Sequence, residues 1–322
     1  MTDQSAVVAQ GLTKRYKNST ALDGVDLEVP RGTVHGLLGP NGAGKTTIVR
    51  ILATLTHADG GSARVAGWDV RTQAREVRRH IGLTGQQTAV DDLMTARQNL
   101  TMFGRLFRLS TTDAQRRADE LLDTFGLTEA SGRTPKKFSG GMRRRLDLAA
   151  SMILAPEVLF LDEPTTGLDP AGRREVWEAM RHLAAQGTTV LLTTHYLDEA
   201  DKLCDRISVI DHGRNLIEDT PAGLKRRIGD EWLELVASDP ADIKDLKQLV
   251  TQILETEPVL EESEARLSVS VKDGVAALTA VAAEISAQRL DIADIGLRRP
   301  TLDEAFLHLT DPAAENSLEE TR

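Results

Sequence analysis

Short apolar runs separated by turn residues recur through the first two thirds of the chain, and they predict buried strands. Val34–Leu38, Val158–Leu161 and Thr189–Thr194 are rich in Val, Leu and Thr, a pattern typical of parallel strands that are covered on both faces. Leu22–Val29 alternates apolar and polar residues instead, which predicts a hairpin strand at a sheet edge. A helical pattern at 173–186 lies between two of these runs. The alternation of strands and helices predicts an α/β domain.

Helical periodicity replaces the strand pattern between residues 94 and 150. The segments 95–109 and 112–125 predict two helices, and a third is expected to run to about residue 152. We therefore expect a helical insertion, at about 88–155, inside an α/β domain that spans 5–228.

The pattern restarts at Trp232 and predicts a separate small module at 229–310. Its order is strand, helix, strand, strand, helix, strand, which is the order of a ferredoxin-like split βαβ fold. The residues from 311 to 322 are polar and are expected to be disordered. The expected strands and helices are Trp232–Val236, Ala241–Glu255, Val259–Leu260, Arg266–Val271, Val275–Gln288 and Ile292–Leu297, followed by a short amphipathic helix at Leu302–Leu309.

A glycine-rich loop after the strand at Val34–Leu38 has the spacing of a phosphate-binding loop, G-x-x-x-x-G-K-[ST]. Glycines allow backbone N–H groups to surround phosphate oxygens, and the helix that follows adds its positive end. Lys45 is expected to contact the β- and γ-phosphates, and the Thr46 hydroxyl is expected to bind Mg²⁺. The expected phosphate-binding residues are Gly39, Pro40, Asn41, Gly42, Ala43, Gly44, Lys45, Thr46 and Thr47.

Polar side chains follow two of the predicted buried strands. Asp162 and Glu163 come after one strand, and His195 follows another. Ligands bind beyond the carboxyl ends of parallel strands, so these side chains are expected to share a crevice with the phosphate loop. Asp162 is expected to hold Mg²⁺, and Glu163 to activate a water molecule for attack on a phosphate. His195 is expected to contact a γ-phosphate.

Two further motifs allow more than one interpretation. Gln86 follows the segment 77–84 and has the chemistry to orient water or bind Mg²⁺, although a glutamine in a loop often does neither. Ser139-Gly140-Gly141 precedes a predicted helix. It fits either a second anion-binding turn or a simple helix cap.

Composition restricts the function further. Charged residues make up 27% of the chain and hydrophobic residues 40%, as in ordinary globular proteins. The net charge of −10 is concentrated after residue 228, where 21 acidic residues face 8 basic ones. An acidic end repels phosphate backbones, so we expect no nucleic-acid partner. The single cysteine, Cys204, excludes an internal disulfide and indicates a small buried residue.

The motifs together resemble those of ATP-binding subunits of ATP-binding-cassette (ABC) transporters, over about residues 5–225. The resemblance implies a P-loop NTPase core with an antiparallel β subdomain and the helical insertion. It implies that Tyr16 stacks on the base of ATP and that Asp169 belongs to the nucleotide site. In this family the Ser-Gly-Gly turn is usually followed by Gln, whereas this chain has Met142. The matching residues, in family order, are Tyr16, Gly39–Thr47, Gln86, Ser139–Gly141, Asp162, Glu163, Asp169 and His195.

A narrower resemblance is to ATPase subunits of the daunorubicin-resistance type. It is carried by Ser139–Arg145, Thr193–Asp201 and Leu302–Phe306. The resemblance implies ATP and Mg²⁺ as ligands, a head-to-tail homodimer, and a separate polytopic membrane permease. It also implies a peripheral location on the cytoplasmic face of the cell membrane and export of an amphiphilic drug, antibiotic or complex lipid. The alternative is an ABC-type ATPase that does not act in transport; ribosomal and repair types usually have two cassettes or a long coiled coil, which this chain lacks.

Overall fold

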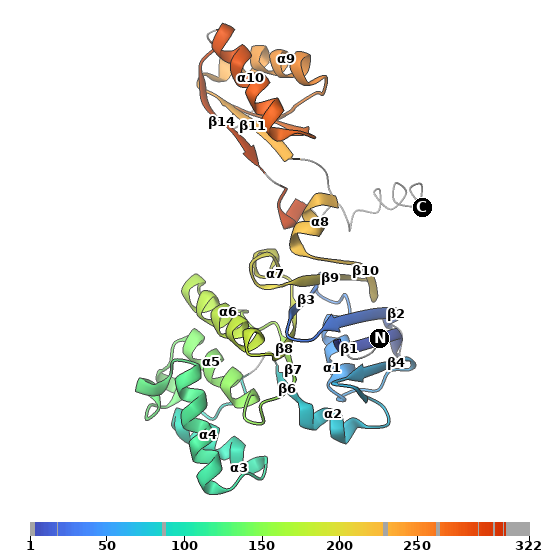
Figure 1. Cartoon of the computed structure of the whole chain (residues 1–322), viewed down its shortest axis with the longest axis vertical. Helices are drawn as coiled ribbons and strands as arrows, with labels where there is room; N and C mark the ends of the chain where they lie inside the picture. The colour runs from blue at the N-terminus through green and yellow to red at the C-terminus, as the bar shows by residue number, and fades with distance from the viewer. Residues whose placement is uncertain are drawn as a thin grey trace. The chain divides into compact units, whose positions relative to one another are not determined.

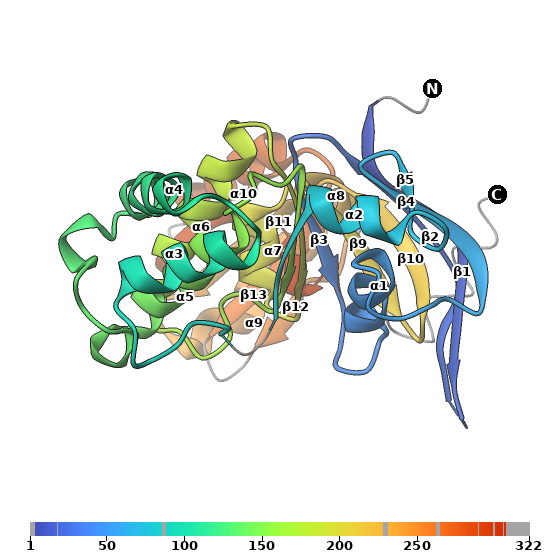
Figure 2. The same cartoon turned by 90° about the horizontal axis from the view of Figure 1, so that it is seen from below.

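The computed structural model describes residues 4–17, 19–85, 88–227, 231–261, 265–288, 290–298, 300–304 and 306. Gln86, a predicted site residue, lies outside these residues. The segment 311–322, which is predicted to be disordered, also lies outside them. The chain divides into two compact units, Met1–Pro221 and Ala222–Arg322, which Figures 1 and 2 show from two directions.

A six-stranded sheet forms the centre of the first unit, in the order β10-β9-β3-β8-β7-β6. Strands β9, β3, β8, β7 and β6 run parallel to one another. The edge strand β10 pairs antiparallel with β9, and the two form a hairpin. Every residue of β3, β7 and β8 is buried, which confirms the interpretation of their apolar runs. The strands are β3 (Val34–Leu38), β6 (Ile81–Thr84), β7 (Val158–Asp162), β8 (Thr189–Thr194), β9 (Arg206–Asp211) and β10 (Arg214–Asp219).

A second, antiparallel sheet has the order β2-β1-β4-β5 and places β2 at its edge, as its alternating pattern predicts. Helix α1 packs between the two sheets, because its apolar residues share one buried cluster with side chains of both (Figures 1 and 2). This packing fixes the phosphate loop, which leads into α1, against both sheets. The elements are β1 (Ser5–Tyr16), β2 (Ser19–Pro30), α1 (Lys45–Leu52), β4 (Gly60–Val65) and β5 (Trp68–Asp69).

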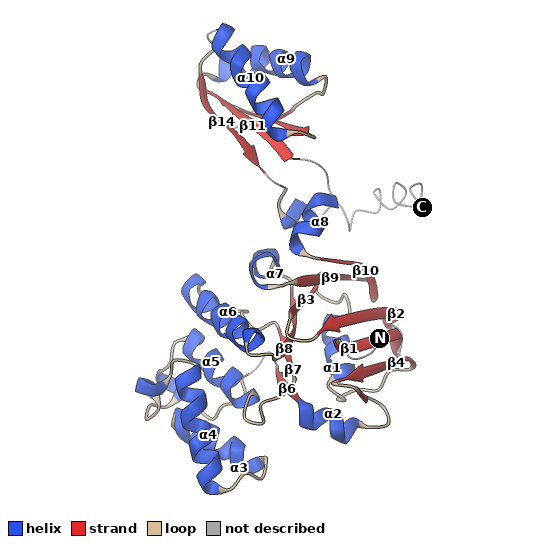
Figure 3. Cartoon of the chain, in the orientation of Figure 1, coloured by secondary structure: helices blue, strands red, loops and turns tan. Residues whose placement is uncertain are grey.

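The predicted helical insertion lies to one side of the central sheet (Figure 3). Its helices are amphipathic and pack against each other through their apolar faces, with α5 also contacting α6 and β6. Besides α1, the α-helices described in the first unit are α2 (Ala74–His80), α3 (Ala96–Leu106), α4 (Thr111–Thr124), α5 (Gly140–Ser151), α6 (Pro170–Ala185) and α7 (Leu197–Leu203).

Several helix boundaries differ from the prediction, and two of these differences have a clear physical reason. The helix expected to run to residue 109 ends at Leu106, and Arg108 has a positive φ of 68° that a helix does not allow. The helix expected to begin at Arg173 begins three residues earlier, at Pro170. Proline suits the first helical position, and the Asp169 side chain accepts a hydrogen bond from the backbone N–H of Gly172, which caps the helix.

The second unit begins with α8 and continues as a four-stranded antiparallel sheet in the order β12-β13-β11-β14. Helices α9 and α10 cover one face of this sheet (Figure 1) and enclose a separate apolar core with it. Order and topology confirm the split βαβ prediction. The elements are α8 (Pro221–Arg227), β11 (Glu231–Ala237), α9 (Ile243–Leu254), β12 (Val259–Glu261), β13 (Arg266–Val271), α10 (Gly274–Gln288) and β14 (Ile292–Arg298).

Among the described residues, no helix is both long enough and apolar enough to cross a lipid bilayer.

Candidate active site

The phosphate loop connects β3 to α1 and depends on glycine at several positions. Gly42 and Gly44 have φ of 86° and 107°, which side chains rarely allow. A Cβ atom on Gly39 would lie 2.0 Å from the Ile210 carbonyl oxygen, and one on Gly44 would lie 2.6 Å from the Ala21 carbonyl oxygen. The loop borders a pocket of about 230 Å³, which is lined by Ala21, Asn41, Gly42, Ala43, Gly44, Lys45, Thr46, Thr47 and Glu163.

Lys45 is the first residue of α1, and its side chain turns back into the loop. The ammonium group donates hydrogen bonds to the carbonyl oxygens of Gly39 (2.6 Å) and Pro40 (2.9 Å). Burial lowers the pKa of Lys45, while the nearby carboxylates of Glu163 and Asp162 act in the opposite direction. The loop therefore combines a cation with backbone N–H groups at a helix start, which is the chemistry that a polyphosphate requires.

Asp162 joins three elements at the carboxyl end of β7. Its Oδ1 accepts hydrogen bonds from the hydroxyls of Thr46 on α1 (3.0 Å) and Thr193 on β8 (2.6 Å). A carboxylate and a hydroxyl beside a phosphate site fit Mg²⁺, which binds few protein oxygens and takes its other ligands from substrate phosphates and water. Over the described residues no cluster of three or more His, Cys, Asp or Glu side chains is suited to a metal, so the fit rests on Asp162 and Thr46.

Glu163 follows Asp162 and has an unusual backbone conformation. Its φ is 49°, a region that costs about 1–3 kcal/mol for a residue other than glycine. The backbone N–H of Glu163 donates to the Thr193 hydroxyl (3.0 Å), and the Thr166 hydroxyl donates to Glu163 Oε2 (3.2 Å). These contacts aim the side chain into the phosphate-loop pocket.

His195 follows β8 and lies against the same carboxylate. Its Nδ1 is 3.4 Å from Glu163 Oε1, and its ring stacks at a tilt on the Tyr196 ring with 4.1 Å between centroids. The structure thus brings together Lys45, Thr46, Asp162, Glu163 and His195, as the order of strands along the chain predicts.

The Ser-Gly-Gly turn occupies a different place in the unit. Ser139 caps α5 by accepting a hydrogen bond from the Met142 N–H (3.1 Å). Gly141 packs closely against Gly172, so that a Cβ on Gly141 would lie 3.0 Å from the Gly172 Cα. The starts of α5 and α6, with Asp169, therefore lie together. Among the described residues that line the phosphate-loop pocket, none belongs to this pair of helix starts.

Tyr16 lies at the end of β1, and its side chain is 43% exposed. The Lys14 ammonium group is 5.4 Å from its ring centroid. The residue does not line the phosphate-loop pocket, so its expected role in stacking on a base stays a prediction.

The sequence did not predict two residues of the site, Thr193 and Arg144. Thr193 links Asp162 to the backbone of Glu163, but a threonine at a strand end is common and signals no function by itself. Arg144 is buried and contacts the backbone of Asp162 and Pro164. Its run, Arg143–Arg145, is a visible signal, but the pattern does not distinguish the buried arginine from its neighbours.

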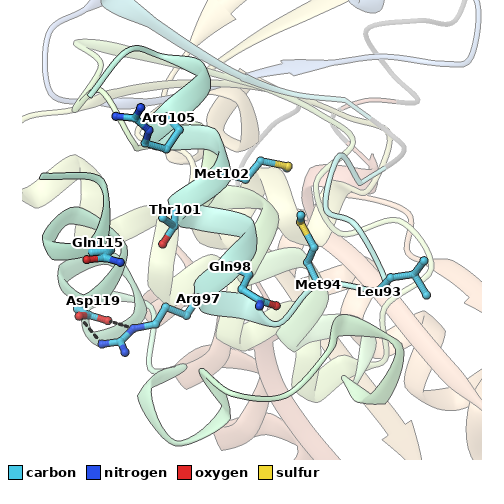
Figure 4. A pocket seen from close by; sticks show the side chains of 9 residues that line it. All are labelled: Leu93, Met94, Arg97, Gln98, Thr101, Met102, Arg105, Gln115 and Asp119. Carbon is cyan, nitrogen blue, oxygen red and sulfur yellow. Dashed lines mark hydrogen bonds and ion pairs between the residues drawn. The ribbon is translucent and has the colours of Figure 1, made fainter. Parts of the chain in front are cut away.

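A groove on the helical insertion forms a second concave surface, with a volume of about 720 Å³. Arg97 on α3 pairs with Asp119 on α4 at one side of it, and Leu93 on the preceding loop is 87% exposed (Figure 4). The other lining side chains are Met94, Gln98, Thr101, Met102, Arg105 and Gln115. Exposed apolar and charged groups beside one another are typical of protein–protein contacts.

The parallel sheet, the phosphate loop and the carboxylates at the strand ends define a P-loop nucleotide hydrolase, and the antiparallel sheet and helical insertion give it the architecture of an ATP-binding cassette. Residues 22–166 match the family model described as ABC transporter.

Comparison with known proteins narrows this class. The chain is 58% identical to the daunorubicin resistance ATP-binding protein DrrA2 of Streptomyces coeruleorubidus, and the match covers 98% of both chains. It is 41% identical to the Nod factor export ATP-binding protein I of Burkholderia lata, over 73% of this chain and 78% of that one. A solved dimeric ATP-binding cassette in a post-hydrolysis state, with ADP and phosphate bound, has a TM-score of 0.59 and 26% identity, covering 66% of this chain and 98% of that one. The chain belongs to the ABC transporter family of ATP-binding proteins and is an ATPase of the exporter type.

Proposed function

We propose that this chain hydrolyses ATP to drive export of an amphiphilic compound through a separate membrane permease. The observation that carries the proposal is that Lys45, Thr46 and Glu163 line one pocket beside the phosphate loop, and that Asp162 accepts a hydrogen bond from Thr46 there. Relatives that cover most of the chain are named for daunorubicin resistance and for export of Nod factor. The first name states resistance to a compound, and the second states export of one.

The protein groups divide the work of phosphoryl transfer between them. Lys45 and the loop N–H groups bind and orient the β- and γ-phosphates of the substrate ATP. Thr46 and Asp162 would hold Mg²⁺, and a bound Mg²⁺ would offset the negative charge of the phosphate oxygens. Glu163 accepts a proton from the attacking water, and His195 orients Glu163 and contacts the γ-phosphate. The strained backbone of Glu163 supports this role, because such strain persists where the surrounding structure holds a residue in place for function.

A second copy of the chain completes the site. Ser139 and Gly140 are exposed at the start of α5, where free N–H groups suit an anion. In a head-to-tail dimer this turn and Asp169 of one protomer would cover the phosphate loop of its partner. The similar cassette that was solved as a dimer supports this arrangement. Binding of ATP would close the dimer, and hydrolysis would open it.

The permease contact is assigned to the groove on α3 and α4. The exposed Leu93 and the partly buried Met94 line this groove together with the Arg97–Asp119 ion pair. This mixture of apolar and charged groups fits a short amphipathic segment of a membrane protein at the cytoplasmic face of the membrane. The groove belongs to the insertion that carries the Ser-Gly-Gly turn, so that movement at the nucleotide site would reach the permease through this subdomain.

Purification of the tagged chain from its own cells in mild detergent tests the transport role. We expect a polytopic membrane protein to co-purify with the wild-type chain. Leu93→Arg, at the groove, should reduce this recovery about tenfold. The matched control is Leu55→Arg, because Leu55 is also exposed (56%) but lies just beyond the end of α1. Recovery of soluble proteins alone with the wild-type chain would contradict the transport role and leave the ATPase intact. Equal loss with both variants would contradict only the groove assignment.

The cargo is tested in cells that lack the gene for this chain. If the cargo is a daunorubicin-like drug, the wild-type gene should restore resistance and lower the amount of drug retained, whereas Lys45→Met should do neither. If the cargo is a complex lipid, drug retention should not change, and the lipid content of the outer surface should fall without the gene.

A further inference from the structure

Arg144 is a buried arginine at the centre of the ATPase unit, on the first turns of α5. Its guanidinium group donates hydrogen bonds to three backbone carbonyl oxygens, two of them around Glu163 and one after β6. The distances are 2.7 Å to Pro164, 2.8 Å to Gly85 and 3.4 Å to Asp162. One side chain therefore connects α5 with the end of β7, the loop that follows it, and the segment after β6.

Asp147 extends this contact by one helical turn. Its Oδ2 lies 3.3 Å from the guanidinium group of Arg144, and its Oδ1 accepts a hydrogen bond from the Ala89 N–H at 2.8 Å. Gly85 and Ala89 flank the segment that contains Gln86. The Arg144–Asp147 pair thus binds the backbone of Gly85 and of Ala89 to α5.

A buried ion pair is costly to desolvate, and it is tolerated where its hydrogen bonds are satisfied. Here the planar guanidinium group offers donors in fixed directions, and each carbonyl lies in one of them. A lysine would keep the charge but would not reach three acceptors in this geometry. The arrangement selects for arginine because of its shape as well as its charge.

We propose that Arg144 is a positioning residue for ATP hydrolysis, which holds the backbone around Glu163 in register with α5. Glu163 lies between two residues whose carbonyls Arg144 binds, Asp162 and Pro164, and it has the strained φ of 49°. The start of the same helix presents Ser139 and Gly140. Arg144 therefore links the carboxylate that activates water to the turn that contacts the partner protomer's nucleotide. This inference rests on the proposed roles of Glu163 and of the Ser-Gly-Gly turn.

Two variants of the full-length chain test the proposal. Arg144→Lys keeps the positive charge but removes the planar guanidinium group and its set of N–H donors. The double variant Arg144→Met with Asp147→Leu removes the pair without leaving a buried charge unpaired, a replacement that buried ion pairs often tolerate. The matched control is Arg117→Lys, because Arg117 on α4 also donates to two carbonyls of the α5 region, those of Met152 and Ile153, at the far end of the helix.

We expect single-turnover hydrolysis of prebound ATP to slow about 100-fold in both test variants, because a misplacement of about 1 Å near the reacting groups has an effect of that size. The Kd for ATP should change less than about threefold, since Lys45 and the loop are intact. Arg117→Lys should hydrolyse ATP like the wild-type chain. Retention of the wild-type rate by folded test variants would overturn the proposal, and so would a rate that falls only in proportion to the folded fraction.

The same assays with Glu163→Gln separate this inference from the role of Glu163. If Glu163→Gln hydrolyses ATP normally, the general-base assignment fails, whatever the Arg144 variants do. If Glu163→Gln is inactive and Arg144→Lys is fully active, only the positioning role of Arg144 fails.

Discussion

The hydroxyl of Thr46 donates a hydrogen bond to Asp162 Oδ1 at 3.0 Å, across 116 positions of sequence. The contact joins the start of α1 to the end of β7, and so it aligns the phosphate loop with the strand that supplies the carboxylates. Both oxygens are of the kind that bind Mg²⁺ beside phosphates.

Thr46→Val should lower the Mg²⁺-dependent rate of ATP hydrolysis at least about tenfold, because it removes a metal-binding hydroxyl and its contact with Asp162 but keeps the shape of the side chain. Thr46→Ser is the control, since it retains the hydroxyl and should stay near the wild-type rate. The rates are measured over a range of Mg²⁺ concentrations. An unchanged rate and Mg²⁺ dependence in Thr46→Val would show that Thr46 is not a metal-binding residue.

Glu163→Gln should lower kcat by about 10²–10⁴-fold, because an amide cannot accept the proton of the attacking water. Since the nucleotide would then stay bound, the variant should form a stable dimer in the presence of ATP, which is measured by light scattering after gel filtration. Glu157→Gln is the matched control, because Glu157 lies at the opposite end of β7 in an exposed ion pair with Arg31. Hydrolysis at the wild-type rate by Glu163→Gln would refute the general-base role.

His35 makes the first unit less stable in mild acid. Burial, together with the nearby charge of Arg206, lowers the pKa of this histidine from 6.5 to about 3. The unfolded chain therefore binds the proton more readily between these two values, and the free energy of unfolding falls as the pH falls below about 6.5. At pH 5 the loss from this group should be about 2 kcal/mol relative to pH 8.

His35→Gln should remove this contribution, so that its free energy of unfolding depends less on pH than that of the wild-type chain. Urea unfolding followed by tryptophan fluorescence measures it, in a Trp232→Phe background that leaves Trp68 and Trp177 to report on the first unit. His212→Gln serves as the control, because the His212 side chain is 94% exposed. The prediction is wrong if the wild-type and His35→Gln proteins lose equal stability between pH 8 and pH 5.

Deletion of Trp232–Arg322 should leave ATP hydrolysis measurable, because the described residues of the active site all belong to the first unit. The resemblance to daunorubicin-resistance ATPase subunits implies a regulatory or dimer-contact role for the ferredoxin-like module, so the deletion should change ATP-dependent dimerisation or export. Dimer mass, ATP hydrolysis and export are compared with those of the full chain. If all three values are normal, the module has no regulatory or dimer-contact role and only adds packing area.

Local sequence was sufficient to predict several parts of the protein. The loop Gly39–Thr47 is recognisable because its chemistry depends on consecutive residues, and the strands at 34–38 and 189–194 were predicted at their observed bounds because burial on both faces leaves an unbroken apolar run. The six elements of the split βαβ module, from β11 to β14, were recognisable for a similar reason, since their periodicity changes clearly between strands and helices.

By itself the sequence determined the α/β class of this chain and its membership of the ABC ATPase family, and it predicted the residues that bind phosphate. Only the tertiary structure decided which arginine of Arg143–Arg145 is buried and that Thr193 supports Asp162 and Glu163. The physical reason is that these roles depend on partners far apart in sequence: Arg144 reaches carbonyls 18, 20 and 59 positions away. Periodicity reports which face of an element is buried, whereas the packing of separate elements decides which polar group that face meets.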